Sequence, residues 1–332
     1  MIVLSICIPS YNRFLNIKAQ LQSLLEIKSN EFDIIIVDNG SPHNIYEEIP
    51  CKDNRVKILK RKKVVSPAYS YNTCVSYADG KYALLLLDQD YINGKYLKAF
   101  IEILKSNETH GGYCVLSSEN TDKEYEVWEK ERALPYFGYL GQHPSGIFFR
   151  TEYIKKLFKM HETIEFENRL FYDILLTECA VQGRMIKCYL PLVRRAKKEE
   201  RLAIQSYNIP TPTPDLFFFP RARLKQMDIY CRHLTGLRCS KDMYNKTVEY
   251  LYKRTLWQMT TLYRLMSLDR AECLHYRISP RKISIFESLY WWFIFNVYFW
   301  RKDINISCGV KLKIIGKVNL MHIKNKVLNR RA

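Results

Sequence analysis

One stretch of the sequence, Y-A-L-L-L-L-D-Q-D-Y at residues 82–91, constrains the fold more than any other. Tyr82 to Leu87 are apolar without interruption, and Asp88-Gln89-Asp90 follows at once. An apolar run this short, ended by turn residues, is typical of a strand buried on both faces of a parallel α/β sheet. Ligands of such sheets bind at the carboxyl ends of the strands. Asp88 and Asp90 are therefore predicted to lie where chemistry takes place.

The two carboxylates suit a hard divalent cation, Mg²⁺ or Mn²⁺. Such a cation takes oxygen ligands and often shares them with substrate phosphates. The same triplet also occurs as an ordinary Asp-rich turn that ends a strand, so the rest of the chain has to decide between the two interpretations.

The first ninety residues alternate between apolar runs and helical patterns, which favours a doubly wound α/β domain. Apolar strands are predicted at residues 3–8, 32–37, 56–59 and 82–87, with helices at 15–25 and 68–78. Further strands are predicted at 113–117, 146–149 and 185–193, and helices at 97–104, 151–158 and 170–181. Residues 119–132 are charged without a clear period and are predicted to form a mobile loop.

The composition changes in the second half of the chain. Residues 1–183 hold 22 Lys and Arg against 24 Asp and Glu, whereas residues 184–332 hold 30 against 10, a net charge of +20. The basic run 194–198 and T-P-T-P at 211–214 indicate a loop or linker, and the pattern beyond is helical. We expect an α/β domain at 1–205 and a basic, aromatic-rich helical region at 206–332. The charge predicts a polyanionic partner: a nucleic acid, an anionic membrane or a phosphorylated lipid.

The ten cysteines are scattered singly, and none has the spacing of a zinc site. The apolar N-terminus lacks a basic leader and a cleavage site, so it is predicted to be a first strand. A reduced, cytoplasmic setting is the simplest expectation for such a chain.

Three motifs in order now suggest a family. They are S-I-C-I-P-S-Y-N-R at 5–13, I-I-I-V-D-N-G-S at 34–41, and Asn72 followed by Gly80 and the D-x-D triplet. In these motifs residues 1–190 resemble the family 2 inverting glycosyltransferases of the GT-A fold, of the bacterial surface-polysaccharide type. The resemblance implies a nucleotide-diphospho-sugar donor, expected to be a UDP-sugar, and a divalent cation, Mn²⁺ or Mg²⁺.

The resemblance also implies roles for the residues of these motifs. Asp38 would accept from the nucleotide base, Asp88 would meet the ribose, and Asp90 would hold the cation at the diphosphate. Tyr91 stands where the family often has another acidic residue, so coordination would rest mainly on Asp90. The other residues expected to line the donor site are Pro9, Ser10, Tyr11, Arg13, Asn39, Asn72 and Gln89.

An inverting transferase also needs a general base for the acceptor hydroxyl. The family places an acidic residue at the start of a helix near the end of the core, which implies Asp173, with Glu167 as the second choice. A solvated helix carboxylate is the alternative for each. His143 in G-Q-H-P-S-G is a candidate for the acceptor side, and a structural loop histidine is its alternative.

The basic half suits an enzyme that works on a glycan or lipid-diphosphate-linked acceptor, peripherally at the inner face of a membrane. Residues 289–300, L-Y-W-W-F-I-F-N-V-Y-F-W, are too few to cross a bilayer. They are predicted to form an interfacial helix, or alternatively a packing helix or an oligomer contact. Nucleic acid is not expected as a partner, because no helix-turn-helix, zinc or single-strand-binding signature accompanies the charge.

Two rival functions remain open at this point. The first is a non-catalytic protein of the same fold that acts as a scaffold or polyanion-binding module at the membrane. The second is a nucleotidyltransferase, which also uses paired acids and a metal. Such enzymes usually carry a Gly-rich basic loop near the first strand, and P-S-Y-N-R does not resemble one.

Overall fold

The structure is a computed structural model that describes residues 1–116, 121–138, 143–160, 171–197, 216–301 and 304–328. The chain divides into two compact units. The first comprises Met1–Ala133 and Gln142–Asn208, and the second comprises Leu134–Gly141 and Ile209–Ala332.

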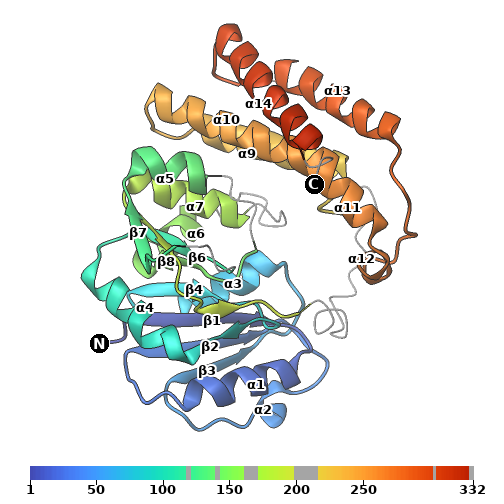
Figure 1. The fold of residues 1–332 in the computed structure, drawn as a ribbon. Coiled ribbons are helices and arrows are strands. Elements are labelled where there is room, and N and C mark those ends of the chain that lie inside the picture. The colour runs from blue at the N-terminus through green and yellow to red at the C-terminus, as the bar shows by residue number, and fades with distance from the viewer. Residues whose placement is uncertain (117–120, 139–142, 161–170, 198–215, 302–303, 329–332) are drawn as a thin grey trace. The chain divides into compact units, whose positions relative to one another are not determined.

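The first unit is built on an eight-stranded mixed sheet of order β3-β2-β1-β4-β8-β6-β9-β7 (Figure 1). Four strands run parallel: β1 (Leu4–Ser10), β2 (Phe32–Asp38), β3 (Val56–Lys60) and β4 (Tyr82–Leu85). The rest of the sheet comprises β8 (Ile147–Arg150), antiparallel to β4, then β6 (Gly111–Cys114), β9 (Met185–Cys188) and β7 (Tyr125–Trp128). A separate ribbon pairs β5 (Tyr91–Ile92) with β10 (Val193–Arg194).

Helices cover both faces of this sheet, because β1, β2 and β4 are apolar on both sides and buried along their length. In Figure 1, α1 (Phe14–Leu25) and α2 (Ile45–Glu48) lie on one face and α3 (Pro67–Ser76) lies on the other. The remaining helices of the first unit are α4 (Gly94–Ser106), α6 (Thr151–Met160) and α7 (Phe171–Gln182), and α5 (Lys130–Phe137) is divided between the two units at Ala133. Alternate β1 residues, Leu4, Ile6 and Ile8, share one core with α1 and α4.

Gly80 shows why the turn before β4 needs a glycine. A Cβ at this position would lie 2.6 Å from the backbone nitrogen of Ser5 and 2.7 Å from the carbonyl carbon of Leu4. The Gly80 N–H donates to Ser5 Oγ at 2.9 Å. This close approach sets the register of β4 beside β1, and so fixes where the D-x-D triplet begins.

Two predictions about the first unit were wrong. Residues 119–132 were expected to be a loop, but residues 125–128 form β7, which pairs with β9, and α5 begins at Lys130. Met185 to Val193 was expected to be one strand. It is divided into β9 and β10 around Pro191, which cannot donate a ladder hydrogen bond.

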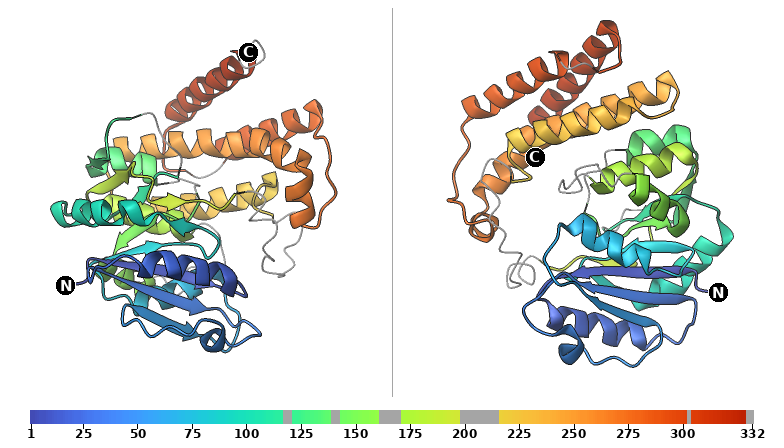
Figure 2. Two further views of the ribbon diagram at one scale, coloured as in Figure 1. Left: turned by 60° about the horizontal axis from the view of Figure 1, so that its bottom comes forward. Right: turned by 180° about the vertical axis from the view of Figure 1, so that it is seen from behind.

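The second unit is helical. Its helices are α9 (Pro220–Thr235), α10 (Lys241–Trp257), α11 (Tyr263–Leu268), α12 (Arg270–His275), α13 (Ile285–Arg301) and α14 (Cys308–Leu328), seen from two more sides in Figure 2. A π-helical turn, Gln258–Leu262, joins α10 to α11. Within the described residues, none of these helices is both long and apolar enough to span a membrane.

A polar network fixes three of these helices together. The amide oxygen of Asn319 in α14 accepts from Trp292 Nε1 in α13 at 2.7 Å. The Tyr252 hydroxyl of α10 donates to Asn296 Oδ1 at 2.6 Å, and Asn319 Nδ2 donates to the same hydroxyl at 3.1 Å. Because these polar groups satisfy one another, they can be buried between the helices at little cost.

Candidate functional site

The predicted site residues of β1, β2 and β4 meet at the carboxyl edge of the parallel strands. Ser10 pairs with Asp38 in the β1–β2 register, and the Tyr11 N–H donates to Asp88 Oδ2 at 3.3 Å. Asp38, Asp88 and Asp90 are all buried. The structure thus gathers three carboxylates at one edge of the sheet.

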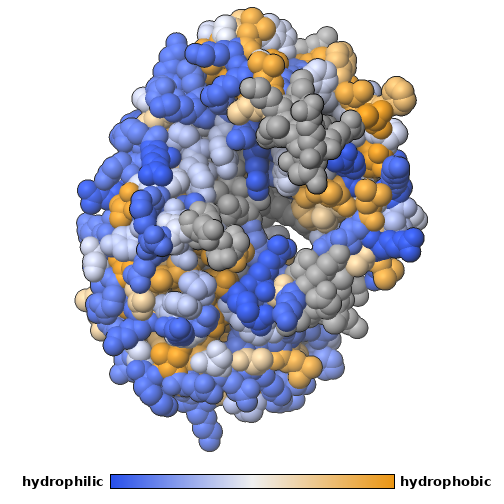
Figure 3. Space-filling model, in the orientation of Figure 1, coloured by the Kyte–Doolittle hydropathy of each residue, from blue (hydrophilic) through white to orange (hydrophobic). Residues whose placement is uncertain are grey.

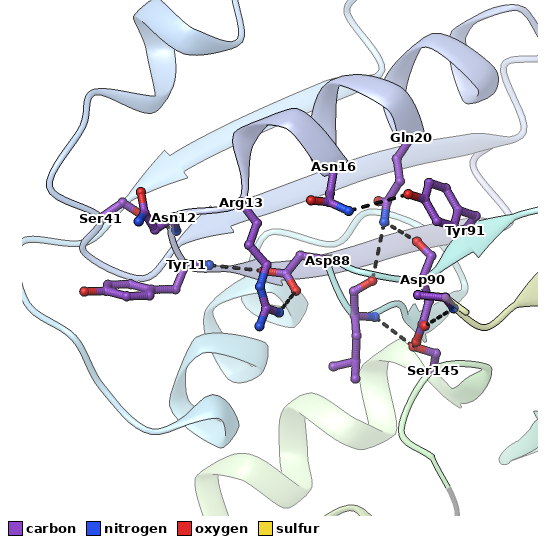
Figure 4. Close-up of polar contacts among 12 residues, drawn as sticks. Tyr11, Asn12, Arg13, Asn16, Gln20, Ser41, Asp88, Asp90, Tyr91 and Ser145 are labelled. Carbon is purple, nitrogen blue, oxygen red and sulfur yellow. Dashed lines mark hydrogen bonds and ion pairs between the residues drawn. The ribbon is translucent and has the colours of Figure 1, made fainter. Parts of the chain in front are cut away.

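Asp88 is held by Arg13, the residue directly before α1 (Figure 4). Arg13 Nη1 lies 2.5 Å from Asp88 Oδ1, and both side chains are almost fully buried. Burial raises the pKa of the Asp88 carboxyl, and the charge and hydrogen bond of Arg13 oppose that rise. Arg13 therefore keeps a buried carboxylate at the end of β4 in a fixed orientation.

Asp38 has one carboxylate oxygen engaged and the other available. Oδ1 accepts from the Ser41 N–H at 3.1 Å and from the Ser41 hydroxyl. Asp38 Oδ2 is buried and has no hydrogen-bond partner among the described residues. Ser41 Oγ also accepts from the N–H of Asn12, at 2.7 Å, and Asn12 has a left-handed φ of 55°, which Asn tolerates better than most residues. The loops after β1 and β2 are thus tied together around a buried acceptor.

The other donor-site candidates differ in whether their side chains already make hydrogen bonds within the protein and in how deeply they are buried. The Asn39 side chain donates to the Val65 carbonyl at 2.8 Å and accepts from the Val65 N–H at 3.1 Å, so it fixes the segment before α3. Pro9 and Ser10 are buried at the end of β1. Asn72 on α3 and Gln89 in the triplet are half-buried.

Asp90 is the most heavily bonded of the three acids. Its Oδ2 accepts from Ser145 Oγ at 2.5 Å and contacts His143 Nε2. Its Oδ1 accepts from the N–H of Ala196 at 3.0 Å. Burial raises the pKa of the Asp90 carboxyl, but the hydrogen bond and charge of His143, together with the other two bonds, hold it below its ordinary value.

The backbone around Asp90 is fixed by residues that the motifs did not reveal. Gln20 on α1 donates to the carbonyls of Leu87, at 3.4 Å, and of Asp90. The Leu87 N–H donates to Ser145 Oγ at 2.9 Å, and β4 ends at Leu85, two residues before the predicted end. Figure 4 shows Ser145 beside Asp90. Gly146, with φ of 93°, allows the turn that presents Ser145. Ser145 stands beside His143 in G-Q-H-P-S-G, which was the only signal available for it.

The chemistry of this donor set fits a cation that is shared with a ligand. Asp90 and His143 bring a carboxylate oxygen and an imidazole nitrogen into contact, while Asp88 is committed to Arg13. Across the described part of the chain, no group of three or more His, Cys, Asp or Glu residues could by itself hold a metal ion. Mg²⁺ and Mn²⁺ commonly bind to one or two protein ligands and take the rest from phosphates and water. The residues present fit that kind of site.

The basic run predicted to be part of a linker begins at this site. Arg194 in β10 pairs with Tyr91 in β5, and its guanidinium carbon lies 4.4 Å from the centre of the Tyr91 ring. Arg194, Arg195 and Lys197 are exposed on either side of the buried Ala196. Cations therefore flank the backbone N–H that binds Asp90, which favours an anionic ligand here.

Asp173 lies in the first turn of α7 and is 8% exposed. Its carbonyl accepts from Thr177 Oγ1 at 2.6 Å. Glu167, the second candidate for the base, lies outside the described residues. Neither assignment is decided by the geometry, and both stay predictions.

Comparisons with known proteins support the interpretation of the first unit. The E. coli protein described as UDP-Glc:alpha-D-GlcNAc-diphosphoundecaprenol beta-1,3-glucosyltransferase WfgD is 27% identical over 122 residues, which cover 36% of this chain and 48% of that protein. The match thus spans about half of that curated relative.

Two solved structures share the fold. S. aureus TarS 1–349 in complex with UDP-GlcNAc has a TM-score of 0.59 at 14% identity, over 90% of this chain and 81% of that one. The mannosyltransferase PcManGT from Pyrobaculum calidifontis, in complex with GDP-Man and Mn²⁺, has a TM-score of 0.51 at 14% identity, over 77% and 71%.

The family described as "Glycosyl transferase family 2" matches residues 5–166, the segment that contains β1 to β4 and the acids at their ends. The match to glycosyl transferase family 2 thus covers residues 5–166, just under half of the chain, and the first unit has the GT-A fold that the motifs predicted.

Proposed function

We propose that this protein is a metal-dependent inverting glycosyltransferase. It takes a hexose-type sugar from a UDP-sugar and adds it to a glycan or lipid-diphosphate-linked acceptor during surface-polysaccharide synthesis. The coarser statement, a family 2 glycosyltransferase, rests on the comparisons above. The finer one rests on the chemistry of the three acids.

The observation that carries the proposal is the buried Asp38 Oδ2, which lacks a partner among the described residues. A buried carboxylate oxygen is costly to leave without a donor, so a ligand that supplies an N–H would be bound strongly. The imide N–H of a uracil base is such a donor. Asp88, already oriented by Arg13, would accept from the ribose hydroxyls at the same edge of the sheet.

The diphosphate would lie beside Asp90. Asp90 and His143 are the residues that would hold a Mn²⁺ or Mg²⁺ ion, which when bound would stabilise negative charge on the leaving diphosphate oxygen. The cations of residues 194–197 would act on the same charge through space. Because the Ala196 N–H donates to the Asp90 carboxylate, these cations are kept close to that carboxylate.

The acceptor step requires a base on the opposite side of the sugar. We assign this role to the Asp173 carboxylate, with Glu167 as the second choice. The base takes the proton of the acceptor hydroxyl as the acceptor oxygen bonds to the anomeric carbon. The bond from that carbon to the diphosphate oxygen breaks at the same time, and UDP leaves with the bonding electron pair. Attack from the face opposite the leaving group inverts the anomeric configuration.

The proposed substrates follow from the relatives and from the charge. WfgD is named for a UDP-sugar donor and a lipid-diphosphate acceptor, and TarS binds UDP-GlcNAc. A lipid-diphosphate acceptor lies in a membrane, and residues 184–332 of this chain carry the +20 net charge that would attract it to an anionic surface. We therefore propose a peripheral location at the inner face of the membrane.

The test is to measure nucleotide release from UDP-glucose, UDP-GlcNAc and GDP-mannose, with Mn²⁺ and with EDTA. We expect UDP release from at least one UDP-sugar, lost in EDTA and restored by Mn²⁺. A protein that binds UDP but releases none under any condition would instead be the non-catalytic scaffold.

A further inference from the structure

The helix α13 is apolar around most of its circumference, but only one of its faces is packed. Phe295 and Phe299 are fully buried, with ring centres 4.9 Å and 4.6 Å from that of Tyr252 in α10. Trp292 is on the same side and donates to Asn319 of α14. The inward face of α13 is therefore fixed by α10 and α14.

The opposite side carries five large apolar side chains that face solvent, which we call the α13 outer face: Ile285, Phe286, Leu289, Tyr290 and Phe293. Their exposed fractions run from 54% for Leu289 to 79% for Phe286. Spacings of one, four, five and eight residues put them on one side of a helix, and none of the five carries a charge. Figure 3 shows hydrophobic side chains gathered over this end of α13. A contiguous exposed apolar surface of this kind indicates an interaction site.

The segment that leads into α13 carries exposed cations. Arg264, Arg270, Arg277, Arg281 and Lys282 are all exposed, and Leu265, Leu268 and Leu274 are exposed among them. Contacts within the second unit place this segment beside the start of α13. Glu287 accepts from the Tyr263 hydroxyl of α11 and from Arg281 Nη2, each at 2.8 Å.

The acids of the same region are already engaged. Asp269 Oδ1 accepts from the N–H groups of Ala271 and Glu272 at the start of α12, both at 3.1 Å. Glu272 is buried, and Glu287 is paired with Arg281. Among residues 264–287 the exposed charged side chains are therefore all cationic, and Arg281 is the one of them that is paired with Glu287.

We propose that the α13 outer face inserts into the interfacial layer of an anionic lipid bilayer, with the cations of residues 264–282 on the lipid headgroups. The 17 residues of α13 span about 25 Å, enough to lie along the surface with one face immersed. A second copy of the chain fits this face less well, because the exposed cations of residues 264–282 would repel those of the other copy.

This inference deepens the membrane location proposed above and rests on it. The residues that face lipid in this proposal differ from those expected from the sequence. The sequence favoured the Leu289–Trp300 run as a whole, including Trp292 and Phe295. In the structure Phe295 is buried and Trp292 is hydrogen-bonded to α14, so the lipid-facing residues begin earlier, at Ile285.

The test uses the full chain and vesicles of phosphatidylglycerol with phosphatidylcholine, compared with phosphatidylcholine alone. The variant is Phe286→Ser with Phe293→Ser. The matched control is Tyr46→Ser with Tyr77→Ser, two aromatic residues of the first unit that are 52% and 51% exposed. We expect the wild type and the control to bind the anionic vesicles, and the α13 variant to partition about tenfold more weakly. Because the replaced side chains are exposed, its melting temperature should match that of the wild type.

Three results would overturn the inference. If the α13 variant binds like the wild type, the docking face is elsewhere while the membrane location stands. If the wild type binds neither vesicle, both fail. If the wild type is a dimer that the variant dissociates, and vesicle binding is unchanged or absent, the occupant is a second copy. UDP release without lipid is scored separately and tests only the enzymatic proposal.

Discussion

The Asp90 carboxylate accepts a hydrogen bond from the backbone N–H of Ala196, 3.0 Å away and 106 residues later in the chain. This bond joins the D-x-D triplet after β4 to the segment that follows β10. It also places Arg195 and its neighbours beside the acids of the candidate site. The site is therefore completed by a part of the chain that lies outside the matched segment 5–166.

Arg195 provides the first prediction. If its exposed guanidinium acts on the donor diphosphate, Arg195→Ala should weaken UDP binding about tenfold through the lost charge interaction, and leave uridine binding unchanged. Calorimetric titration with UDP and with uridine checks both. Arg238→Ala, an exposed arginine of the second unit, is the control and should change neither. Equal weakening of UDP and uridine would show that Arg195 acts on the fold of the pocket instead.

The second prediction concerns the Arg13–Asp88 ion pair, in which the side chains are 11% and 4% exposed. Arg13→Ala should lower the free energy of unfolding by about 3 kcal/mol, because it leaves a buried carboxylate without its cation. Adding Asp88→Asn should recover about 1 kcal/mol or more of that loss. Urea denaturation of the two single variants and the double variant measures this coupling, and strictly additive losses would refute it.

Much of the acidic site could be predicted from the sequence because its signals are local. Asp38 ends one apolar strand, and Asp88 follows the apolar run of another. Parallel strands bring their carboxyl ends to one edge of the sheet, so the two residues are expected to meet there. Gln20, Ser145 and Ala196 could not be predicted in the same way. They reach Asp90 only through long-range packing, and the neighbouring His143 is the single local signal, for Ser145 alone.

The second unit shows a different limit of sequence reasoning. The pattern in Leu289–Trp300 predicted a helix, which α13 confirms, but an all-apolar helix gives no sign of which face is buried. Phe293 and Phe295 are two residues apart and alike in chemistry, yet one is 57% exposed and the other fully buried. The charged stretch that forms β7 was missed because its apolar and polar residues do not alternate clearly. Pairing with β9 makes it a strand.

Glu126 in β7 gives a pH-dependent prediction. The hydrogen bond from Lys123, with those from Trp128 and Tyr189, lowers the pKa of Glu126 to about 2. A carboxyl with a lowered folded-state pKa adds stability above its unfolded pKa of about 4.3, and this contribution is lost as the pH falls toward about 2. Glu126→Gln should therefore melt below the wild type near neutral pH, with a difference that shrinks at about pH 3.

Thermal melts of the two proteins across that range measure the difference. Glu108→Gln, which removes an exposed carboxyl 4.0 Å from Lys81, should show little difference at any pH. A Glu126→Gln difference that grows toward low pH would contradict the assigned direction.

The fourth prediction concerns the base. Asp173→Asn removes the proton acceptor without changing the shape of the side chain, so transfer to an acceptor should fall by about a hundredfold or more. UDP binding should stay at the wild-type level, because the donor contacts lie elsewhere. If transfer survives, Glu167→Gln should abolish it. If UDP binding falls together with transfer, Asp173 has a structural role.

The most direct test of the account is UDP binding to the wild type and to Asp90→Asn, each titrated with Mn²⁺ and with EDTA. Glu102→Gln, an exposed carboxyl of α4, serves as the control. We predict that Mn²⁺ tightens UDP binding about tenfold or more in the wild type and the control. Asp90→Asn should lose this enhancement and keep the metal-independent binding. If Asp90→Asn keeps the full Mn²⁺ enhancement, Asp90 does not hold the cation and the proposed metal site is wrong.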